Sequence, residues 1–248
     1  MTELFGSTRT VVTSRYALIT PDGFVPGQLP GWKDAVVVVN ISPALAGPRF
    51  TQLHATLERE AVGEGNTGPN EYFLYVIEGN GTVALTDKRH RLEPGSYVYL
   101  PPGKDLQVKS AGPPMKLLVF QKPFEAVKGV AVPSTVVAHE RDVKGQPFLG
   151  NDGARLQVLL PDEPPFDMAV NIFTYQPGAT LPFVETHVME HGLLMLRGQG
   201  IYRLDRDYFP VQAGDVIWMA SYCPQWFVAM GKTPASYIYY KDVNREPM

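Results

Sequence analysis

The amino-acid sequence predicts an all-β fold of two tandem jelly-roll barrels, that is, two double-stranded β-helices in one chain. The 248 residues include 23 Gly and 23 Pro spread along the chain, which suits many short strands joined by turns and leaves little room for long helices. The second half also repeats the first at a constant spacing of 119 residues. A chain of this length can form one large or two small cores, and the repeat favours two.

The repeat is clearest where Glu71–Gly81 is laid over Glu190–Gly200. Each copy alternates short apolar or aromatic runs with turns that contain glycine, a residue that permits backbone conformations other residues disfavour. Closely spaced strands of this kind, present in duplicate, are typical of paired jelly rolls. Continued without a gap, the spacing aligns Leu85 with Leu204, Gly95 with Gly214, Gly112 with Gly231 and Lys122 with Lys241.

The repeat also divides the chain into segments. Residues 1–48 resemble neither copy and are expected to form an N-terminal arm or extra strands. Residues 49–122 then form the first barrel and 166–248 the second. The stretch 123–165 between them is rich in proline, so we expect a linker that is irregular in part.

Charge and cysteine content exclude several classes of protein. The chain has 22 Lys and Arg against 25 Asp and Glu, a formal net charge of −3, which argues against a nucleic-acid partner. The longest apolar run, Ala35–Val39, is too short to cross a bilayer, and the start shows no secretory signal, so no membrane partner is expected. A single cysteine fits a reducing compartment. We therefore expect a cytoplasmic protein.

Two of the five histidines stand together in Glu185-Thr-His187-Val-Met-Glu-His191. On a helix, Glu185 and His187 would point to nearly opposite sides. On an extended strand, positions 185, 187 and 191 face the same way. Pro182 before and Gly192 after disfavour a helix. The pattern therefore predicts one carboxylate and two imidazoles that converge from a single strand into the second barrel.

The first copy provides an internal control for these ligands. The same spacing places Asn66, Gly68 and Tyr72 at the three positions, so the first barrel is expected to lack a metal site. It also places Leu106 at the position of Gln225, which lies in a later strand crossing the same barrel mouth. Gln225 is therefore the natural fourth ligand of the second barrel.

The spacing Glu185-x-His187-x₃-His191, followed by Gly198-x-Gly200 and by Pro210-x₃-Gly214-Asp215, resembles the two cupin motifs. More narrowly, the ligand segment and the tail Tyr-Ile-Tyr-Tyr-Lys-Asp-Val-Asn-Arg at 237–245 resemble (S)-ureidoglycine aminohydrolases, manganese-dependent bicupins of purine catabolism. The likeness covers most of the chain, including 18–23 and 73–77.

The resemblance implies a cofactor, a site and a partner. It assigns metal binding to Glu185, His187, His191 and Gln225. Two imidazoles, one carboxylate and one amide oxygen, without thiolate, suit Mn²⁺ or Fe²⁺ with positions open to substrate or water, while Ni²⁺ and Zn²⁺ stay open as well. The partner is a small-molecule ureido substrate, and homo-oligomerisation is implied too. The resemblance further places three residues in the catalytic pocket: Tyr202, Tyr237 and Lys241.

Some of these residues have simpler interpretations that the sequence leaves open. Lys241 falls on Lys122 of the copy without ligands, so both are compatible with ordinary cations at a strand end. Tyr202 and Tyr237 are equally compatible with packing. Glu190 falls on Glu71 and has the wrong parity for the trio, so a structural role is predicted. Structural or surface roles are also predicted for the other histidines: His54, His90 and His139.

The activity implied is hydrolysis of (S)-ureidoglycine to (S)-ureidoglycolate and ammonia. One alternative is another metal-dependent cupin reaction, such as O₂-dependent oxidation of a small acid. The other is a bicupin that binds a small molecule without catalysis.

Overall fold

The computed structural model describes residues 8–85 and 88–245 and is built almost wholly from β-strands, which confirms the all-β prediction. Its described residues form two compact units. The first barrel unit comprises residues 25–45, 49–85 and 88–142. The second barrel unit comprises residues 8–24, 46–48 and 143–245.

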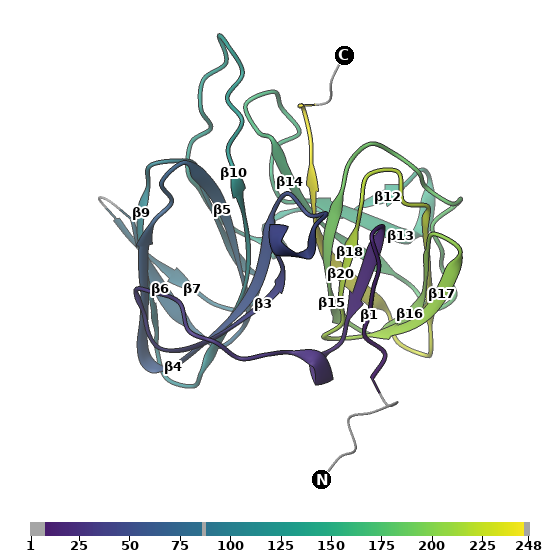
Figure 1. Cartoon of the computed structure of the whole chain (residues 1–248), viewed down its shortest axis with the longest axis horizontal. Helices are drawn as coiled ribbons and strands as arrows, with labels where there is room; N and C mark the ends of the chain where they lie inside the picture. The colour runs from purple at the N-terminus through teal and green to yellow at the C-terminus, as the bar shows by residue number, and fades with distance from the viewer. Residues whose placement is uncertain (1–7, 86–87, 246–248) are drawn as a thin grey trace. The chain divides into compact units, whose positions relative to one another are not determined.

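The first barrel unit is one nine-stranded sheet in the order β11-β8-β5-β10-β4-β9-β6-β7, with β3 paired to β4 (Figure 1). Alternate apolar side chains along these strands fill its interior, among them Leu53, Leu74 and Val119. The elements are β3 (Trp32–Ile41), η2 (Pro43–Leu45), β4 (Thr51–Asn66), β5 (Asn70–Glu78), β6 (Gly81–Leu85), β7 (Lys88–Leu92), β8 (Ser96–Leu100), β9 (Asp105–Ser110), β10 (Met115–Pro123), β11 (Val136–His139) and η3 (Glu140–Asp142).

The second barrel unit combines an eight-stranded sheet, in the order β1-β2-β18-β15-β20-β14-β13-β12, with a three-stranded sheet, β17-β16-β19. Its interior is unusually aromatic, with Phe173, Tyr175, Tyr237 and Phe227 in contact with one another. The elements are β1 (Val11–Val12), β2 (Tyr16–Ile19), η1 (Pro21–Gly23), β12 (Gln146–Phe148), β13 (Asn151–Val158), β14 (Met168–Tyr175), β15 (His191–Arg197), β16 (Gln199–Leu204), β17 (Asp207–Gln212), β18 (Val216–Met219), β19 (Gln225–Met230) and β20 (Ala235–Asp242).

Segments outside the repeat complete the sheets. The expected N-terminal arm is shared: β2 pairs with β18 in the second barrel unit, and β3 pairs with β4 in the first. The expected linker, 123–165, contains β11, which pairs with β8. It also contains the hairpin β12–β13, and β13 pairs in turn with β14. Each of these strands covers hydrogen-bonding groups that would otherwise lie open at a sheet edge. Residues 1–7 of the arm lie outside the described residues.

The internal repeat is visible strand by strand. Tyr72 pairs with Leu100, and His191 pairs with Met219, at the same spacing of 119 residues. Gly79 and Gly198 end the corresponding strands with φ of +76° and +73°. A Cβ atom at either glycine would lie 2.4 or 2.6 Å from the carbonyl oxygen of a proline, Pro114 or Pro234 respectively, so only glycine fits.

The two prolines reveal a change of register in the repeat. They are 120 residues apart, so the turn after Gly231 is one residue longer than the turn after Gly112. Strand pairing agrees, because Gln121 lies opposite Tyr72 whereas Lys241 lies opposite His191. The counterpart of Lys241 is therefore Gln121, and the expected match with Lys122 was wrong by one residue.

That one-residue shift places the two lysines on opposite faces of their strands. Lys122 is 5% exposed, and its Nζ lies 3.5 Å from Oε1 of the buried Glu71. Lys241 lines a cavity inside the second barrel. The simple interpretation of Lys241 as a repeat of Lys122 therefore fails.

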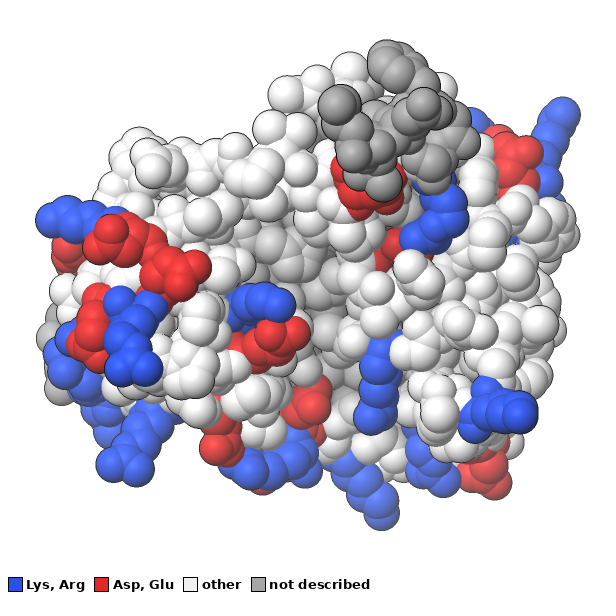
Figure 2. Space-filling view, turned by 90° about the horizontal axis from the view of Figure 1, so that it is seen from below, with Lys and Arg blue, Asp and Glu red and all other residues white. Residues whose placement is uncertain are grey.

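Acidic and basic side chains lie close to one another on the face shown in Figure 2, around a largely uncharged surface. Among the described residues, none of the helices has the length and apolar character needed to span a bilayer.

An ion pair with a buried carboxylate ties the N-terminal segment to the second barrel. Arg9 donates from Nη1 and Nη2 to the two carboxylate oxygens of Asp215, at 2.6 and 2.8 Å. The Asp215 side chain is fully buried and also accepts from the backbone N–H of Gln212 at 2.8 Å. A bidentate pair of this kind is among the stronger hydrogen-bonded contacts in proteins.

The substitution Arg9→Ala is expected to lower the free energy of unfolding by about 2 kcal/mol or more, because it leaves the buried Asp215 carboxylate without its cation. Arg155→Ala is the matched control, since its partner Asp152 is 85% exposed. Loss of that surface pair is expected to change the stability by less than about 1 kcal/mol. Urea unfolding followed by circular dichroism measures both values, and equal losses would contradict the role given to Arg9.

Candidate functional site

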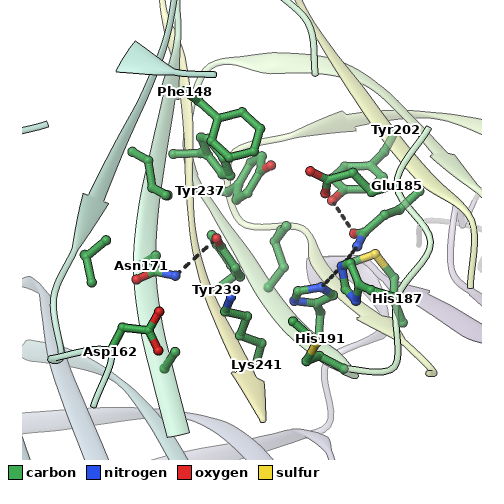
Figure 3. Close-up of a pocket in the computed structure, with 18 residues that line it drawn as sticks. Phe148, Asp162, Asn171, Glu185, His187, His191, Tyr202, Tyr237, Tyr239 and Lys241 are labelled. Atoms are coloured by element: carbon green, nitrogen blue, oxygen red, sulfur yellow. Dashed lines mark hydrogen bonds between the residues drawn. The ribbon is translucent and has the colours of Figure 1, made fainter. Parts of the chain in front are cut away.

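The second barrel encloses a cavity of about 220 Å³. This volume is below the roughly 300–1,000 Å³ typical of sites for drug-sized ligands, so it suits a small metabolite. All seven residues proposed from the sequence line it (Figure 3): Glu185, His187, His191, Tyr202, Gln225, Tyr237 and Lys241.

The two histidines face each other inside this cavity. Nε2 of His187 lies 3.1 Å from Nε2 of His191, and the side-chain amide nitrogen of Gln225 lies 2.9 Å from the same atom of His187. Burial holds the pKa of both imidazoles below the ordinary value, and the charge of Lys241 lowers both further. Both rings are therefore neutral at neutral pH, as metal ligands must be.

Hydrogen bonding fixes the tautomer of His191. Its Nδ1 lies 3.3 Å from the backbone carbonyl of Tyr240, an oxygen that only accepts, so Nδ1 carries the hydrogen and Nε2 presents a lone pair. A histidine that ligates a metal usually donates its other ring N–H to a carbonyl or carboxylate in this way. When Gln225 donates to His187, neither Nε2 atom carries a hydrogen, so the two imidazole nitrogens form no hydrogen bond with each other, an arrangement that a bound cation stabilises.

The spacing of these atoms also fits a metal ion. Ligand atoms about 2.1 Å from a metal and at right angles to each other lie roughly 3.0 Å apart. The separations of 3.1 and 2.9 Å around His187 match that value. An amide has its oxygen and nitrogen in interchangeable positions, so Gln225 can present its oxygen to a cation. The imidazoles and the amide therefore form a fitting donor set.

Glu185 reaches the site differently from the single strand expected. It forms an isolated β-bridge to Gln225, with two backbone hydrogen bonds of 2.9 Å, whereas residues 186–190 are irregular and β15 begins at His191. The expectation of one continuous strand was wrong, because the chain bends between the two histidines. Burial raises the pKa of Glu185, an effect that Lys241 partly offsets.

The Glu185 carboxylate stands beside the Tyr202 ring in Figure 3, apart from the imidazoles. Its charge raises the pKa of Tyr202 further, after burial. Within 8–85 and 88–245, no three His, Cys, Asp or Glu side chains already converge as a metal cluster. The observed convergence is that of two histidines with an amide, and Glu185 adjoins it through the backbone bridge.

The loop that carries His187 is held by the N-terminal segment of the same unit. The backbone N–H of Tyr222 donates to the His187 carbonyl at 2.7 Å. Arg15 Nη2 in turn donates to the Tyr222 carbonyl at 2.9 Å, and the Arg15 carbonyl accepts from the N–H of Ala220. This chain of contacts fixes the backbone next to one of the two imidazoles.

The two tyrosines proposed from the sequence are buried and hydrogen-bonded within the protein. Tyr202 donates to Oε1 of Gln225 at 3.3 Å, which connects it directly to the donor set. Tyr237 shares a hydrogen bond of 2.9 Å with Tyr175 in the aromatic core. Burial raises the pKa of both cavity tyrosines, so both hydroxyl groups stay protonated at neutral pH.

Sequence reasoning missed a second polar pair in the cavity wall. Asn171 on β14 and Tyr239 on β20 lie opposite each other in the sheet, and Asn171 Nδ2 donates to the Tyr239 hydroxyl at 3.2 Å. Two signals in the sequence point to them. Tyr239 has the same strand parity as Tyr237 and Lys241, and Asn171 interrupts an otherwise apolar run.

Glu190 takes the structural role predicted for it. It is 2% exposed, and its Oε2 accepts from the indole N–H of Trp218 at 3.3 Å. The counterpart Glu71 accepts from the hydroxyl of Tyr99 at 2.7 Å, so both barrels use this glutamate in the same way.

The first barrel has a cavity of about 300 Å³ at the corresponding place, lined by Leu53, Tyr72, Leu106, Val119 and Gln121, among other residues. Tyr72 and Leu106 stand where the second barrel has His191 and Gln225, as expected. The residue paired with Leu106 is Gly65, one position before the expected Asn66. No residue at these positions supplies an imidazole or a carboxylate.

Comparison with known proteins places this chain in a family. The family model described as a cupin domain matches residues 54–120. (S)-ureidoglycine aminohydrolase from Arabidopsis thaliana is 37% identical over 99% of this chain and 82% of its own length. The enzyme of the same name from Escherichia coli K12 is 35% identical over 98% of this chain and 94% of its own. The chain belongs to the (S)-ureidoglycine aminohydrolase family.

Solved structures agree with this (S)-ureidoglycine aminohydrolase family fold. Protein Ylba from Escherichia coli has a TM-score of 0.87 at 32% identity, covering 98% of this chain and 97% of that one. A putative glyoxylate-induced protein from Pseudomonas aeruginosa has a TM-score of 0.89 at 32% identity, covering 98% and 93%. Bacillus subtilis oxalate decarboxylase, at 12% identity and a TM-score of 0.73 over 97% of this chain and 80% of that one, shares the fold alone. The cupin fold typically binds a metal.

The double variant His187→Ala with His191→Ala is expected to bind Mn²⁺ more than about 100-fold more weakly, because even outer-shell partners of a metal contribute 10- to 100-fold. Equilibrium dialysis with metal analysis measures the change, and circular dichroism checks that the variant is folded. The control is His90→Ala with His139→Ala, which alters two histidines outside the cavity. Unchanged Mn²⁺ binding by the first variant would exclude the histidine pair as ligands.

Proposed function

We propose that this chain hydrolyses (S)-ureidoglycine to (S)-ureidoglycolate and ammonia in purine catabolism. The observation that carries the proposal is the convergence of His187, His191 and Gln225 in a small cavity, in a chain that belongs to this family. The substrate carries an amine, a carboxylate and a ureido nitrogen on one carbon. In the reaction the bond from that carbon to the amine breaks and a bond to a water oxygen forms. One hydrogen of the water remains on the new hydroxyl group, and the other leaves with ammonia.

Glu185, His187, His191 and Gln225 would hold the metal ion, for which Mn²⁺ is our proposal. A divalent cation, when bound, stabilises developing charge on a substrate and lowers the pKa of a coordinated water. The chain's own contribution is to position and enclose the substrate. Among the described residues that line the cavity, Lys241 is the one lysine or arginine, so it supplies the counter-charge for the substrate carboxylate.

The aromatic residues that line the narrow cavity restrict how the substrate can lie, and this restriction favours one stereochemical outcome. An aminal of this kind loses ammonia readily by itself, so holding one face of the reacting carbon toward water is the task left to the protein. Tyr202 supports that task because its hydroxyl lies 3.3 Å from the Gln225 amide and can hydrogen-bond to either end of it, as donor or as acceptor. The cytoplasmic location and homo-oligomerisation stay predictions, and light scattering after size-exclusion chromatography measures the latter.

Freshly generated ureidoglycine is expected to yield ammonia and the S product with the metal-loaded protein, under anaerobic conditions as well as in air. Removal of the metal by chelation is expected to abolish the stereoselective release, and Mn²⁺ is expected to restore it. Full activity in metal-free protein would contradict the metal dependence. A requirement for O₂ would favour oxidation of a small acid, and the absence of turnover would favour a non-catalytic binding protein.

Lys241→Met is expected to lower kcat/KM by about 10- to 100-fold, because a hydrogen bond to a charged group contributes roughly 1.5–3 kcal/mol. Gln121→Met is the matched control, since Gln121 holds the corresponding strand position in the first barrel. Steady-state kinetics of ammonia release compares the two variants. Similar, small effects of both substitutions on kcat/KM would contradict a role for Lys241 in substrate binding or catalysis.

A further inference from the structure

Within the cavity, the tyrosine hydroxyl groups differ in what they contact. Tyr202 donates to Gln225, and Tyr237 is paired with Tyr175. Tyr239 instead accepts a hydrogen bond from Asn171 Nδ2 at 3.2 Å, which leaves its own hydrogen to be donated. For the described residues, the hydrogen bonds of the Tyr239 hydroxyl include no acceptor for that hydrogen, and Oδ1 of Asn171 is likewise buried without a hydrogen-bond partner. A buried donor without an acceptor lowers stability by about 1–3 kcal/mol, so a group of this kind points to a ligand.

The first barrel shows that the fold does not require this polar pair. Strand pairing makes Val119 the counterpart of Tyr239 and Leu53 the counterpart of Asn171, since Val119 pairs with Leu53 as Tyr239 pairs with Asn171. Both apolar residues belong to the hydrophobic core of the first barrel. The second barrel thus places an amide and a phenol where the same architecture is otherwise filled by aliphatic side chains.

The pair faces the cavity from the side opposite Glu185 and His187 (Figure 3). Asn171 is 4% exposed and Tyr239 is 8% exposed, and both line the cavity. The Tyr239 ring is stacked on Phe173, with ring centroids 5.8 Å apart, and meets His191 edge to face at 5.4 Å. These contacts fix the ring, and with Asn171 Nδ2 as the donor of their shared hydrogen bond, the Tyr239 hydroxyl keeps its own hydrogen for another acceptor.

We propose that Tyr239 is a substrate-binding residue that donates its hydroxyl hydrogen to the carbonyl oxygen of the ureido group, and that Asn171 is the positioning residue that holds the hydroxyl as a donor. This inference rests on the proposed function, and it names the part of the substrate that Asn171 and Tyr239 recognise. With the carboxylate at Lys241 and the ureido oxygen at Tyr239, two substituents of the reacting carbon are held. The carbon then presents its amine toward the histidine side in one orientation.

Two ligands of nearly equal shape test the donor directly. N-carbamoylglycine has the ureido carbonyl oxygen and lacks the departing amine, whereas N-amidinoglycine has a protonated nitrogen where that oxygen would be. A donor at Tyr239 accepts the first ligand and rejects the second. Isothermal titration with the metal-loaded protein is expected to give wild-type protein a preference of about tenfold or more for N-carbamoylglycine, as for sites built to hydrogen-bond a ligand.

Tyr239→Phe keeps the ring against His191 and removes only the hydroxyl. This variant is expected to bind N-carbamoylglycine about tenfold more weakly and to bind N-amidinoglycine with unchanged or higher affinity. It is also expected to retain its full metal content. Asn171→Leu copies Leu53 of the first barrel and is expected to reduce the same preference, with a rise in KM larger than the fall in kcat. Gln121→Met in the first barrel is the control, and it should keep the wild-type preference.

An unchanged ligand preference in Tyr239→Phe would overturn the inference, and so would equal weakening of both ligands in Asn171→Leu, which a purely structural role produces. Wild-type protein that shows no preference would overturn it too. These titrations measure no turnover, so they are separate from the proposed function. Absence of ammonia release by wild-type protein would count against the proposed activity. A wild-type protein that releases ammonia but shows no ligand preference would count only against the role of Tyr239.

Discussion

The site depends on the pairing of one central strand with two neighbours. β20 pairs with β14 along one edge and with β15 along the other. Residues directly opposite each other in paired strands project to the same face of the sheet. Tyr239 therefore stands beside Asn171, and Lys241 stands beside His191, all facing the interior. The positive charge, the neutral imidazole and the amide–phenol pair are brought together by backbone hydrogen bonds alone, before any side chain interacts.

The polar interior of the second barrel is held by the structure around it. Two imidazoles, a carboxylate and a lysine lower the stability of an apolar interior unless each finds a partner. The imidazoles find partners in the Tyr240 carbonyl and the Gln225 amide. Arg15 of the N-terminal segment binds the Tyr222 carbonyl and so holds the loop that carries His187. The first barrel has the same framework with aliphatic residues in its interior. The contrast separates the residues that build the barrel from those that carry its chemistry.

Much of this could be predicted from the sequence, for identifiable reasons. Gly and Pro spacing predicted the short strands, and matched glycines revealed the duplication because Gly79 and Gly198 have no room for a side chain. Two histidines that occur in only one copy predicted the position of the cavity. His187, His191 and Gln225 converge there and Glu185 adjoins them through its backbone bridge, while the role of each stays a prediction.

Other features lay beyond a one-dimensional pattern. The bend between Glu185 and His191 depends on the backbone bridge to Gln225, which joins segments far apart in the sequence. The Arg9–Asp215 pair joins residues at a separation of 206 positions, with no local signal at either end. Asn171 and Tyr239 become a pair only through the register of β14 against β20. Long-range pairing of this kind sets which side chains meet, and the sequence shows each partner singly.

The extra residue in the turn before β20 has a consequence for how such proteins diversify. Because side chains alternate along a strand, adding or removing a single residue in a hairpin exchanges its inner and outer faces. In the first barrel the shorter turn directs Lys122 to Glu71, while in the second the longer turn directs Lys241 into the cavity. After duplication, one inserted codon can thus bring new side chains into a binding pocket without any substitution. A gap-free superposition of the two halves conceals such an event, because each lysine then falls on the other.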